Sequence, residues 1–288
     1  MKKALALLLA LCLCFTLGMA LVSCDEEAPE HTHTFKTDWS KDATNHWHVC
    51  EGEGCTEVSE KAEHTFGEAT KVKNGVYNYA CTGCDHVKTE TMETKLTAEQ
   101  FANLTLGENF IVTLNATGYQ DNTAVATVTW IEMRDGNKFS TERVTSSLNN
   151  DLKDEYNVFF VAEEDQVYRY DVEYDDNGVL TSCTKLGIGL TLAHKAELVE
   201  GTFLFDEFKN ASAFTYDEET NTYIAATIRA ESNQITCTNV KAAFENGKIV
   251  SLSFTYTVDD ESTVIYEYEF AFAYGTASIT VPDPIPVA

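Results

Sequence analysis

The stretch Val264-Ile-Tyr-Glu-Tyr-Glu-Phe-Ala-Phe272 places a large aromatic side chain at every second position, with glutamates between several of them. Successive side chains of a β-strand point to opposite faces of the sheet, so this period indicates a strand with one buried and one exposed face. The aromatic row consists of Tyr266, Tyr268, Phe270 and Phe272. The stretch therefore predicts a half-buried strand near the end of the chain.

The same alternation recurs upstream, which extends the prediction to a whole sheet. Leu252, Phe254, Tyr256 and Val258 form one such row, and Tyr168, Tyr170, Val172 and Tyr174 form another. Tight-turn signals separate the strands at Asp135-Gly136-Asn137, Asp176-Asn177-Gly178 and Asn246-Gly247. Strands joined by short turns are antiparallel neighbours. We expect an antiparallel β domain over residues 95 to 281.

Helical signals in that region are few. Thr97-Ala98-Glu99-Gln100 matches a capping box, and residues 190 to 198 favour a second short helix. The proline-rich end from Pro282 cannot continue a sheet ladder, so we expect residues 282 to 288 to form a tail. The predicted fold class is mainly β (α+β).

The N-terminus has the layout of a secretion signal. Met1-Lys2-Lys3 is basic, residues 4 to 22 are apolar, and Ser23 precedes Cys24. The segment resembles the lipobox of bacterial lipoproteins, which implies removal of residues 1 to 23, a lipid on Cys24 and a linker over 24 to 30. An ordinary signal peptide or an N-terminal membrane helix are the alternatives. The resemblance implies a protein attached to the extracytoplasmic face of a membrane by its N-terminal lipid.

The formal net charge of −26 limits the partners. So acidic a chain repels nucleic acid and anionic headgroups, and we expect neither as a partner. Beyond the N-terminal segment the sequence has no second apolar run of about 18 residues, the length that a membrane-spanning helix requires.

Residues 31 to 92 hold six of the seven histidines and four of the nine cysteines. Cys81-Thr-Gly-Cys84 has the spacing of a zinc knuckle, and Cys50 and Cys55 form a wider version of it. Two such pairs on separate hairpins are the layout of a zinc ribbon. We expect a structural zinc bound by Cys50, Cys55, Cys81 and Cys84. A mixed site of Cys50 and Cys55 with two of His33, His48 and His64 is the close alternative.

Disulfides between the same cysteines are the alternative to a metal site, because an exported chain meets an oxidising environment.

The run from His31-Thr-His33 through Asn45-His-Trp-His-x-Cys50 resembles a Cys/His-rich repeat of surface proteins from gut Firmicutes. This chain departs from that pattern in two respects. Its first cysteine pair is wider than the family's, and Thr70-Lys71-Val72 stands where a further cysteine is often found.

The C-terminal part is similar to lipoproteins of the LolA-like superfamily. The similarity rests on the pattern of strands and helices, on Phe203-Leu-Phe205-x-x-Phe208, and on the ending that runs from Tyr274 to Pro282. It implies an antiparallel half-barrel whose concave face holds acyl chains or lipid. In that case Tyr266, Tyr268, Phe270 and Phe272 line a ligand cavity; otherwise they fill an ordinary core.

Catalytic motifs are missing from the sequence. It has no G-x-S-x-G elbow and no glycine-rich phosphate loop, and His194 is the only histidine of the β domain. Cys183 and Cys237 are either bridged or buried as thiols. We expect a non-catalytic lipoprotein that carries a hydrophobic ligand or lipid, with a metal-binding or scaffold lipoprotein as the alternative and a hydrolase in third place.

Overall fold

The computed structural model describes residues 32–150, 152–164, 166–175, 177–204, 206–230, 235–258 and 264–285. These residues form two compact units. The smaller unit contains residues 32–67 and 80–86, and the larger unit contains 68–79 and the described residues from Val87 onward. The chain therefore passes between the units at three points, after residues 67, 79 and 86, whereas the sequence suggested a single junction near residues 93 to 96.

The smaller unit is built around a three-stranded sheet of β1 (Ser40–Lys41), β2 (Asn45–Val49) and β3 (Val58–Glu63). The turn between β1 and β2 is held by Asp42, whose Oδ1 accepts hydrogen bonds from the backbone N–H groups of Thr44 and Asn45 at 2.7 and 2.6 Å. A second three-stranded sheet of β4 (Phe66–Lys73), β5 (Val76–Cys81) and β6 (Val87–Thr91) is shared between the two units.

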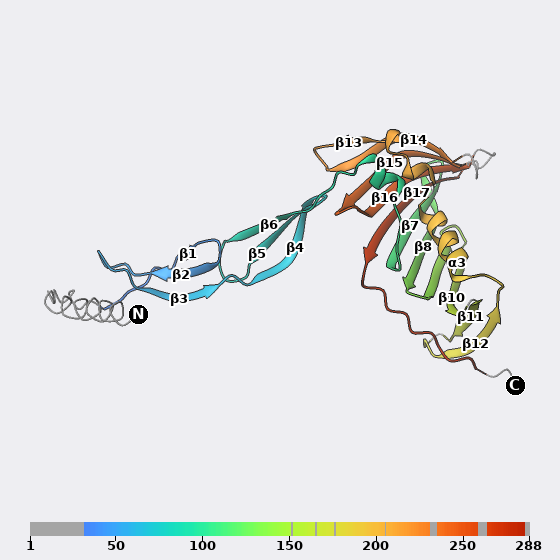
Figure 1. The fold of residues 1–288 in the computed structure, drawn as a ribbon. Helices are drawn as coiled ribbons and strands as arrows, with labels where there is room; N and C mark the ends of the chain where they lie inside the picture. Colours follow the sequence, from blue (N-terminus) through green and yellow to red (C-terminus); the bar gives the residue numbers. More distant parts are fainter. Residues whose placement is uncertain are drawn as a thin grey trace, which may run out of the picture. The chain divides into compact units, whose positions relative to one another are not determined.

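The larger unit contains an antiparallel sheet that, among the described residues, has eleven strands in the order β12-β11-β10-β9-β8-β7-β17-β16-β15-β14-β13 (Figure 1). The strands are β7 (Asn109–Gln120), β8 (Thr123–Asp135), β9 (Lys138–Ser147), β10 (Lys153–Glu163), β11 (Gln166–Tyr174), β12 (Leu180–Gly187), β13 (Thr215–Asp217), β14 (Thr222–Ala230), β15 (Ile235–Glu245), β16 (Lys248–Val258) and β17 (Val264–Tyr274). Asn246-Gly247 joins β15 to β16 as predicted. The mainly β prediction is confirmed, and the sheet is open.

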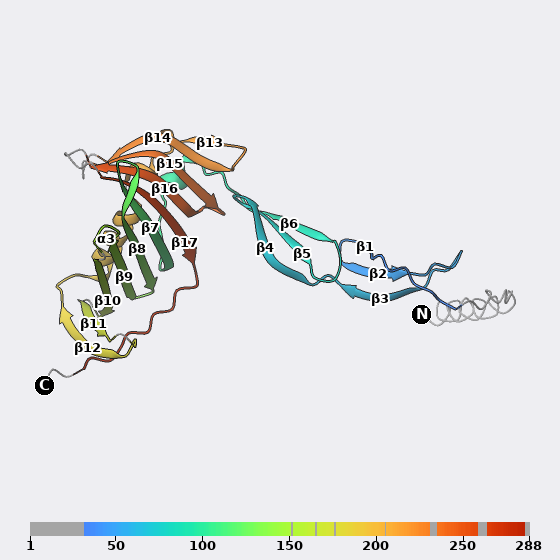
Figure 2. The same ribbon diagram turned by 180° about the vertical axis from the view of Figure 1, so that it is seen from behind.

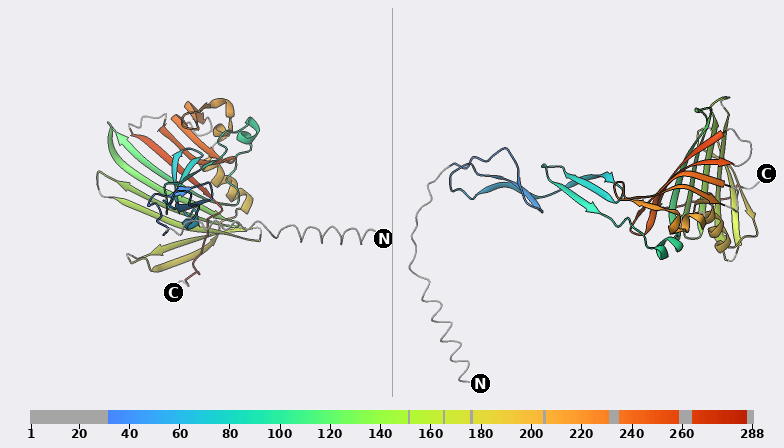
Figure 3. Two further views of the ribbon diagram at one scale, coloured as in Figure 1. Left: turned by 90° about the vertical axis from the view of Figure 1, so that its left-hand side faces the viewer. Right: turned by 90° about the horizontal axis from the view of Figure 1, so that it is seen from above.

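Helical segments lie on the concave side of this sheet (Figures 1 and 2). They are α2 (Ala98–Ala102), α3 (Leu192–Phe203) and the 3-10 turns η1 (Asp206–Lys209) and η2 (Ala211–Ala213). The capping box at Thr97 is confirmed, since its side chain accepts from Gln100 N and the Gln100 side chain accepts from Thr97 N. Figure 3 shows the curvature of the sheet in two further views.

Aromatic side chains fill the space between the helices and the sheet. Phe101 of α2 is 1% exposed and packs edge-on against Tyr223 and Phe244. Phe203 of α3 packs edge-on against Trp130 and Phe270. The alternating aromatic rows thus supply one face of a core that the helices complete.

The chain after β17 is irregular but packed. Residues 275 to 285 form no strand. Ile279 is only 4% exposed and Val281 packs against the small cluster of Tyr170, Val172 and Cys183, so both belong to the larger unit's packed interior, within the expected domain of residues 95 to 281. Ile285 N donates to the Cys183 carbonyl at 3.0 Å. Proline blocks a sheet ladder but not apolar burial, so this segment covers a second, smaller core.

The β4–β5 turn is fixed within the larger unit. Asn74 is 5% exposed, and its Nδ2 donates to the carbonyls of Asn221 and Phe244 at 2.9 and 3.1 Å. Asn221 Nδ2 donates back to the Asn74 carbonyl at 2.9 Å. Gly75 has φ +70°, and a Cβ there would collide with the Thr94 methyl group. This Asn-Gly turn therefore also anchors the β4–β5 hairpin to the rest of the larger unit.

Candidate metal centres

Four side chains converge at one end of the smaller unit: His46 of β2, His64 just after β3, and Cys81 and Cys84 of the knuckle that follows β5. One potential ligand atom from each lies within 4.8 Å of the others. The knuckle is held by a hydrogen bond from Gly83 N to Cys81 Sγ at 3.4 Å. A Cβ on Gly83 would lie 3.1 Å from the His46 ring, so glycine at this position allows the close approach of the histidine.

The two histidine rings turn the same nitrogen toward this point. His64 Nε2 lies 3.0 Å from the Asp42 carbonyl, which can only accept, so Nε2 carries the proton and Nδ1 of the neutral ring is left as a ligand. His46 Nδ1 lies 3.3 Å from His64 Nδ1. Histidines that bind metals commonly donate their other N–H to a carbonyl in this manner. The hydrogen bond to Asp42 also raises the pKa of His64.

The two thiols of this group differ in acidity. Burial alone raises the pKa of Cys81, but the N–H of Gly83 and the neighbouring His64 outweigh it and lower the pKa to about 6. Burial raises the pKa of Cys84. Since metals bind the thiolate, Cys81 is prepared as a ligand at neutral pH, and a bound cation would be needed to deprotonate Cys84.

A second group consists of His33, Cys50 and Cys55. His33 Nδ1 lies 3.6 Å from Cys50 Sγ and 3.3 Å from Cys55 Sγ. The loop between the cysteines is closed by a hydrogen bond from Cys55 N to the Gly52 carbonyl at 3.0 Å, and Gly54 adopts φ +75°. The sulfur of Cys50 beside it raises the pKa of Cys55. Three protein ligands from this group could hold a metal.

The structure therefore differs from the single four-thiolate site expected from the sequence. Cys50 and Cys55 lie in one group, and Cys81 and Cys84 lie in the other. The reason is the length of β2: His46 belongs to the first group and Cys50 to the second, and four residues of extended strand separate their Cα atoms by roughly 13 Å. The start of β2 thus brings His46 to Cys81 and Cys84, whereas Cys50, just after its end, meets His33 from the preceding segment, whose Phe35 pairs with Cys50.

The three histidines expected as ligands likewise do not share one site. His33 and His64 each join one group, but His48 lies in neither. Its ring stacks on Trp39 at 3.8 Å, and its Nδ1 faces the Asp38 carbonyl at 3.3 Å. His46, which was not among the ligands expected from the sequence, takes the ligand position. Spacing cannot separate His46 from His48, because both precede Cys50 in one strand and only tertiary contacts distinguish them.

The other cysteine predictions have different outcomes. None of the six described cysteines forms a disulfide. Cys183 lies in the small cluster beneath residues 275 to 285, and Cys237 lies in the main core, where burial raises its pKa to about 12. The proposed lipid site Cys24, the signal segment 1 to 23 and the linker 24 to 30 lie outside the described residues.

The predicted cavity residues lie on one face of β17 but in different surroundings. Tyr268 and Phe270 line an apolar hollow of about 160 Å³, together with Leu114, Trp130, Thr202, Phe203, Phe254 and Tyr256. Phe272 is 7% exposed within the core, and the Tyr266 ring lies across Gly118, where a Cβ would approach it to 2.8 Å. Half of the predicted row therefore lines a hollow.

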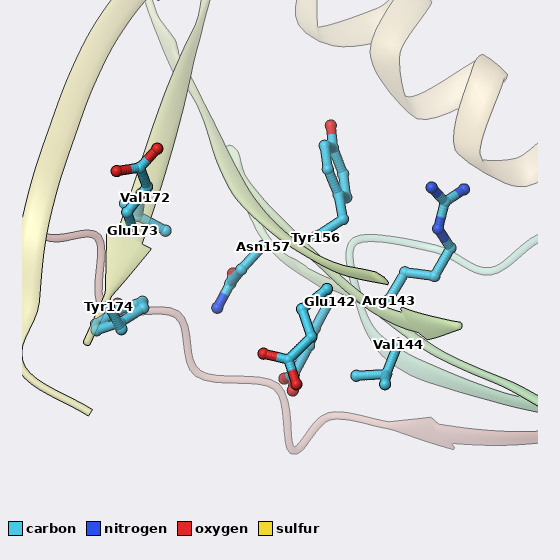
Figure 4. Close-up of a pocket in the computed structure, with 9 residues that line it drawn as sticks. Glu142, Arg143, Val144, Tyr156, Asn157, Val172, Glu173 and Tyr174 are labelled. Atoms are coloured by element: carbon cyan, nitrogen blue, oxygen red, sulfur yellow. The ribbon is translucent and has the colours of Figure 1, made fainter. Parts of the chain in front are cut away.

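A larger hollow of about 340 Å³ occurs where β10 and β11 diverge (Figure 4). The β10–β11 ladder runs only from Val158 opposite Asp171 to Glu163 opposite Gln166. Figure 4 shows Arg143 and Tyr156 pointing to one side of the sheet and Glu142 and Val144 to the other. With three carboxylates against one guanidinium in its lining, this hollow has no clear ligand chemistry.

Comparison with known proteins gives no family for the chain. No family model matches it, and no curated protein matches it. In the part of the chain that the structure describes, no helix combines the length and apolar character that crossing a membrane requires.

Proposed function

We propose that this chain is an exported, lipid-anchored, non-catalytic protein whose Cys/His unit binds two zinc ions that stabilise it. The observation that carries the proposal is the convergence of His46 Nδ1 and His64 Nδ1, 3.3 Å apart, beside the sulfurs of Cys81 and Cys84. Two nitrogens and two sulfurs are a donor set that Zn²⁺ takes in tetrahedral structural sites. His33, Cys50 and Cys55 supply three ligands of the same kind for the second ion.

Elemental analysis of the purified full chain tests the metal and its identity. We expect about two zinc ions per chain and four thiols in the unit that react with alkylating agents only after a chelator has been added. Mass mapping that finds Cys50–Cys55 and Cys81–Cys84 disulfides in metal-free protein would overturn the proposal in favour of oxidised cysteines.

The lipid anchor is tested separately, by a variant at the cysteine that follows Ser23. Cys24→Ser removes the thiol that the lipobox resemblance assigns to the lipid. We expect the wild-type chain in the membrane fraction of the native host and the variant in the soluble exported fraction. Unchanged membrane association of the variant would favour an N-terminal membrane helix instead.

A second candidate function, carriage of a hydrophobic ligand or lipid, is favoured by the apolar hollow beside Tyr268 and Phe270 and by the resemblance to LolA-like lipoproteins. Native mass spectrometry and organic extraction of the purified protein would reveal a retained ligand. A protein that binds no apolar molecule in either experiment or in titration would exclude this function.

A further inference from the structure

A polar pair lies buried between α3 and the concave face of the sheet. Glu132 of β8 is 2% exposed, and the Lys195 side chain of α3 is 12% exposed. Both line a hollow of about 220 Å³ whose other walls include Trp130, Tyr156, Phe160 and Phe203. Charged side chains are rarely buried in an aromatic environment without a specific role for their polar atoms.

The hydrogen bonds of Glu132 are incomplete. Its Oε2 accepts from the Thr141 hydroxyl at 2.7 Å and from Trp130 Nε1 at 3.3 Å. Within the described ranges Oε1 has no hydrogen-bond partner, and Lys195 Nζ is 3.8 Å away from it. That distance exceeds a hydrogen bond. Lys195 Nζ instead lies 3.9 Å from the centroid of the Phe160 ring.

The pair is neutral as a whole. Burial raises the pKa of Glu132 and lowers the pKa of Lys195, while each charge favours the ionised form of the other. With one proton between them the net charge is zero, whether the proton resides on the amine or on the carboxyl group. The ionised pair would attract an entering ion with one charge and repel it with the other, so it gives no net compensation for the desolvation of a charged head group.

The polar hollow adjoins the apolar one. Trp130, Thr202 and Phe203 line both, and from there the apolar hollow continues along Phe254, Tyr268 and Phe270. An elongated molecule could therefore place a polar end beside Lys195 and Glu132 and an apolar body along the aromatic side chains. Few convergent polar groups in a mostly apolar pocket are typical of small-molecule sites.

We propose that this crevice binds an uncharged amphiphile whose hydroxyl or amide head both accepts a hydrogen bond from Lys195 Nζ and donates one to Glu132 Oε1. Such a head satisfies both buried groups and adds no charge. The proposal rests on the second candidate function, ligand carriage, and names the ligand class that this function would serve.

Calorimetric titration of the full chain with three probes of equal tail length tests the head group. The probes are 1-decanol, decanoate and decylamine. We expect 1-decanol to bind at least tenfold more tightly than either charged probe. Equal or tighter binding of decanoate or decylamine would overturn the head-group assignment and leave ligand carriage intact. If none of the three binds, the head-group proposal fails, and ligand carriage is then decided by native mass spectrometry and extraction.

Two charge variants sharpen the test. Glu132→Gln retains an acceptor and removes the negative charge, so decanoate should gain at least tenfold in affinity. Lys195→Met removes the positive charge, so decylamine should gain instead. Glu197→Gln, an exposed position of the same helix, is the matched control and should change no affinity. Unchanged probe selectivity in folded Glu132→Gln protein would contradict the proposal.

A blocking variant covers the case in which the charge variants do not fold. Thr202 is exposed and lines both hollows, so Thr202→Trp fills their junction without removing a buried group. We expect the affinity for 1-decanol to fall at least tenfold. Binding of 1-decanol that is unaffected by Thr202→Trp would place the ligand elsewhere and overturn the proposal.

Discussion

The two units of this protein bury different kinds of side chain. Among the described residues of the smaller unit, the buried side chains are His46, Cys50 and Cys81, all potential metal ligands. The larger unit buries a continuous aromatic and aliphatic core that includes Phe101 and Phe244. A small module with so little apolar burial needs another source of stability. If the proposed ions are bound, one chain combines a unit held by ligand bonds with one held by packing.

The largest expected effect is that of metal removal, which should destabilise the smaller unit and leave the larger unit folded. Structural zinc sites contribute on the order of 10 kcal/mol of binding free energy that acts as folding free energy. A chelator should therefore abolish hydrogen-exchange protection of β2 and β3, while β7, β8 and β17 stay protected. Mass-spectrometric exchange on the full chain measures both at once. Protection of β2 and β3 that survives complete metal removal would contradict the comparison.

A core truncation should produce the reverse pattern. Phe101→Ala removes a ring that is 1% exposed and contacts Phe214, Tyr223 and Phe244. We expect a loss of about 3–5 kcal/mol in the unfolding free energy of the larger unit, from denaturant titration. Ile265→Ala, at a side chain 44% exposed, is the control and should change it little. Equal effects of the two variants would mean that Phe101 does not belong to a packed core.

A smaller loss of stability is expected from a substitution at Asn74, in the turn between β4 and β5. Asn74→Ala removes the donors to the Asn221 and Phe244 carbonyls. Leaving these acceptors without partners should cost about 1–3 kcal/mol in the larger unit. Thr70→Ala, an exposed position of β4, serves as the control. If Asn74→Ala and Thr70→Ala unfold at the same denaturant concentration, the turn does not stabilise the larger unit.

The smallest effect concerns Glu200 of α3. Burial alone raises its pKa, but hydrogen bonds from Thr105 and Lys209 outweigh that and place the pKa below the ordinary 4.5. Its stabilising contribution is thus present above pH 4.5 and is lost as the pH falls through the lower, folded-state value. We expect Glu200→Gln to cost about 1 kcal/mol at pH 7 and almost nothing below the folded-state pKa. A cost that does not change with pH in paired denaturation curves would argue against an ionised Glu200.

Sequence patterns predicted the structure best where it depends on residues that are close together in the chain. The alternation from Val264 to Phe272 and the Asn246-Gly247 turn depend on neighbouring residues, and both prediction and structure agree there. The metal groups could not be assigned, because the choice between His46 and His48 depends on which partner each end of β2 meets. The hydrogen bond from Ile285 to Cys183 was also hidden, since the prolines beside Ile285 indicate the absence of a ladder but not the absence of other contacts.

We propose that each cysteine pair binds its own ion, and the number of zinc ions retained by two double variants distinguishes this arrangement from a single shared centre. Native mass spectrometry of the wild type should show two zinc ions, and Cys50→Ser/Cys55→Ser and Cys81→Ser/Cys84→Ser should each retain one. Loss of all zinc from either double variant would instead indicate a single centre shared by the four thiolates and would contradict the account.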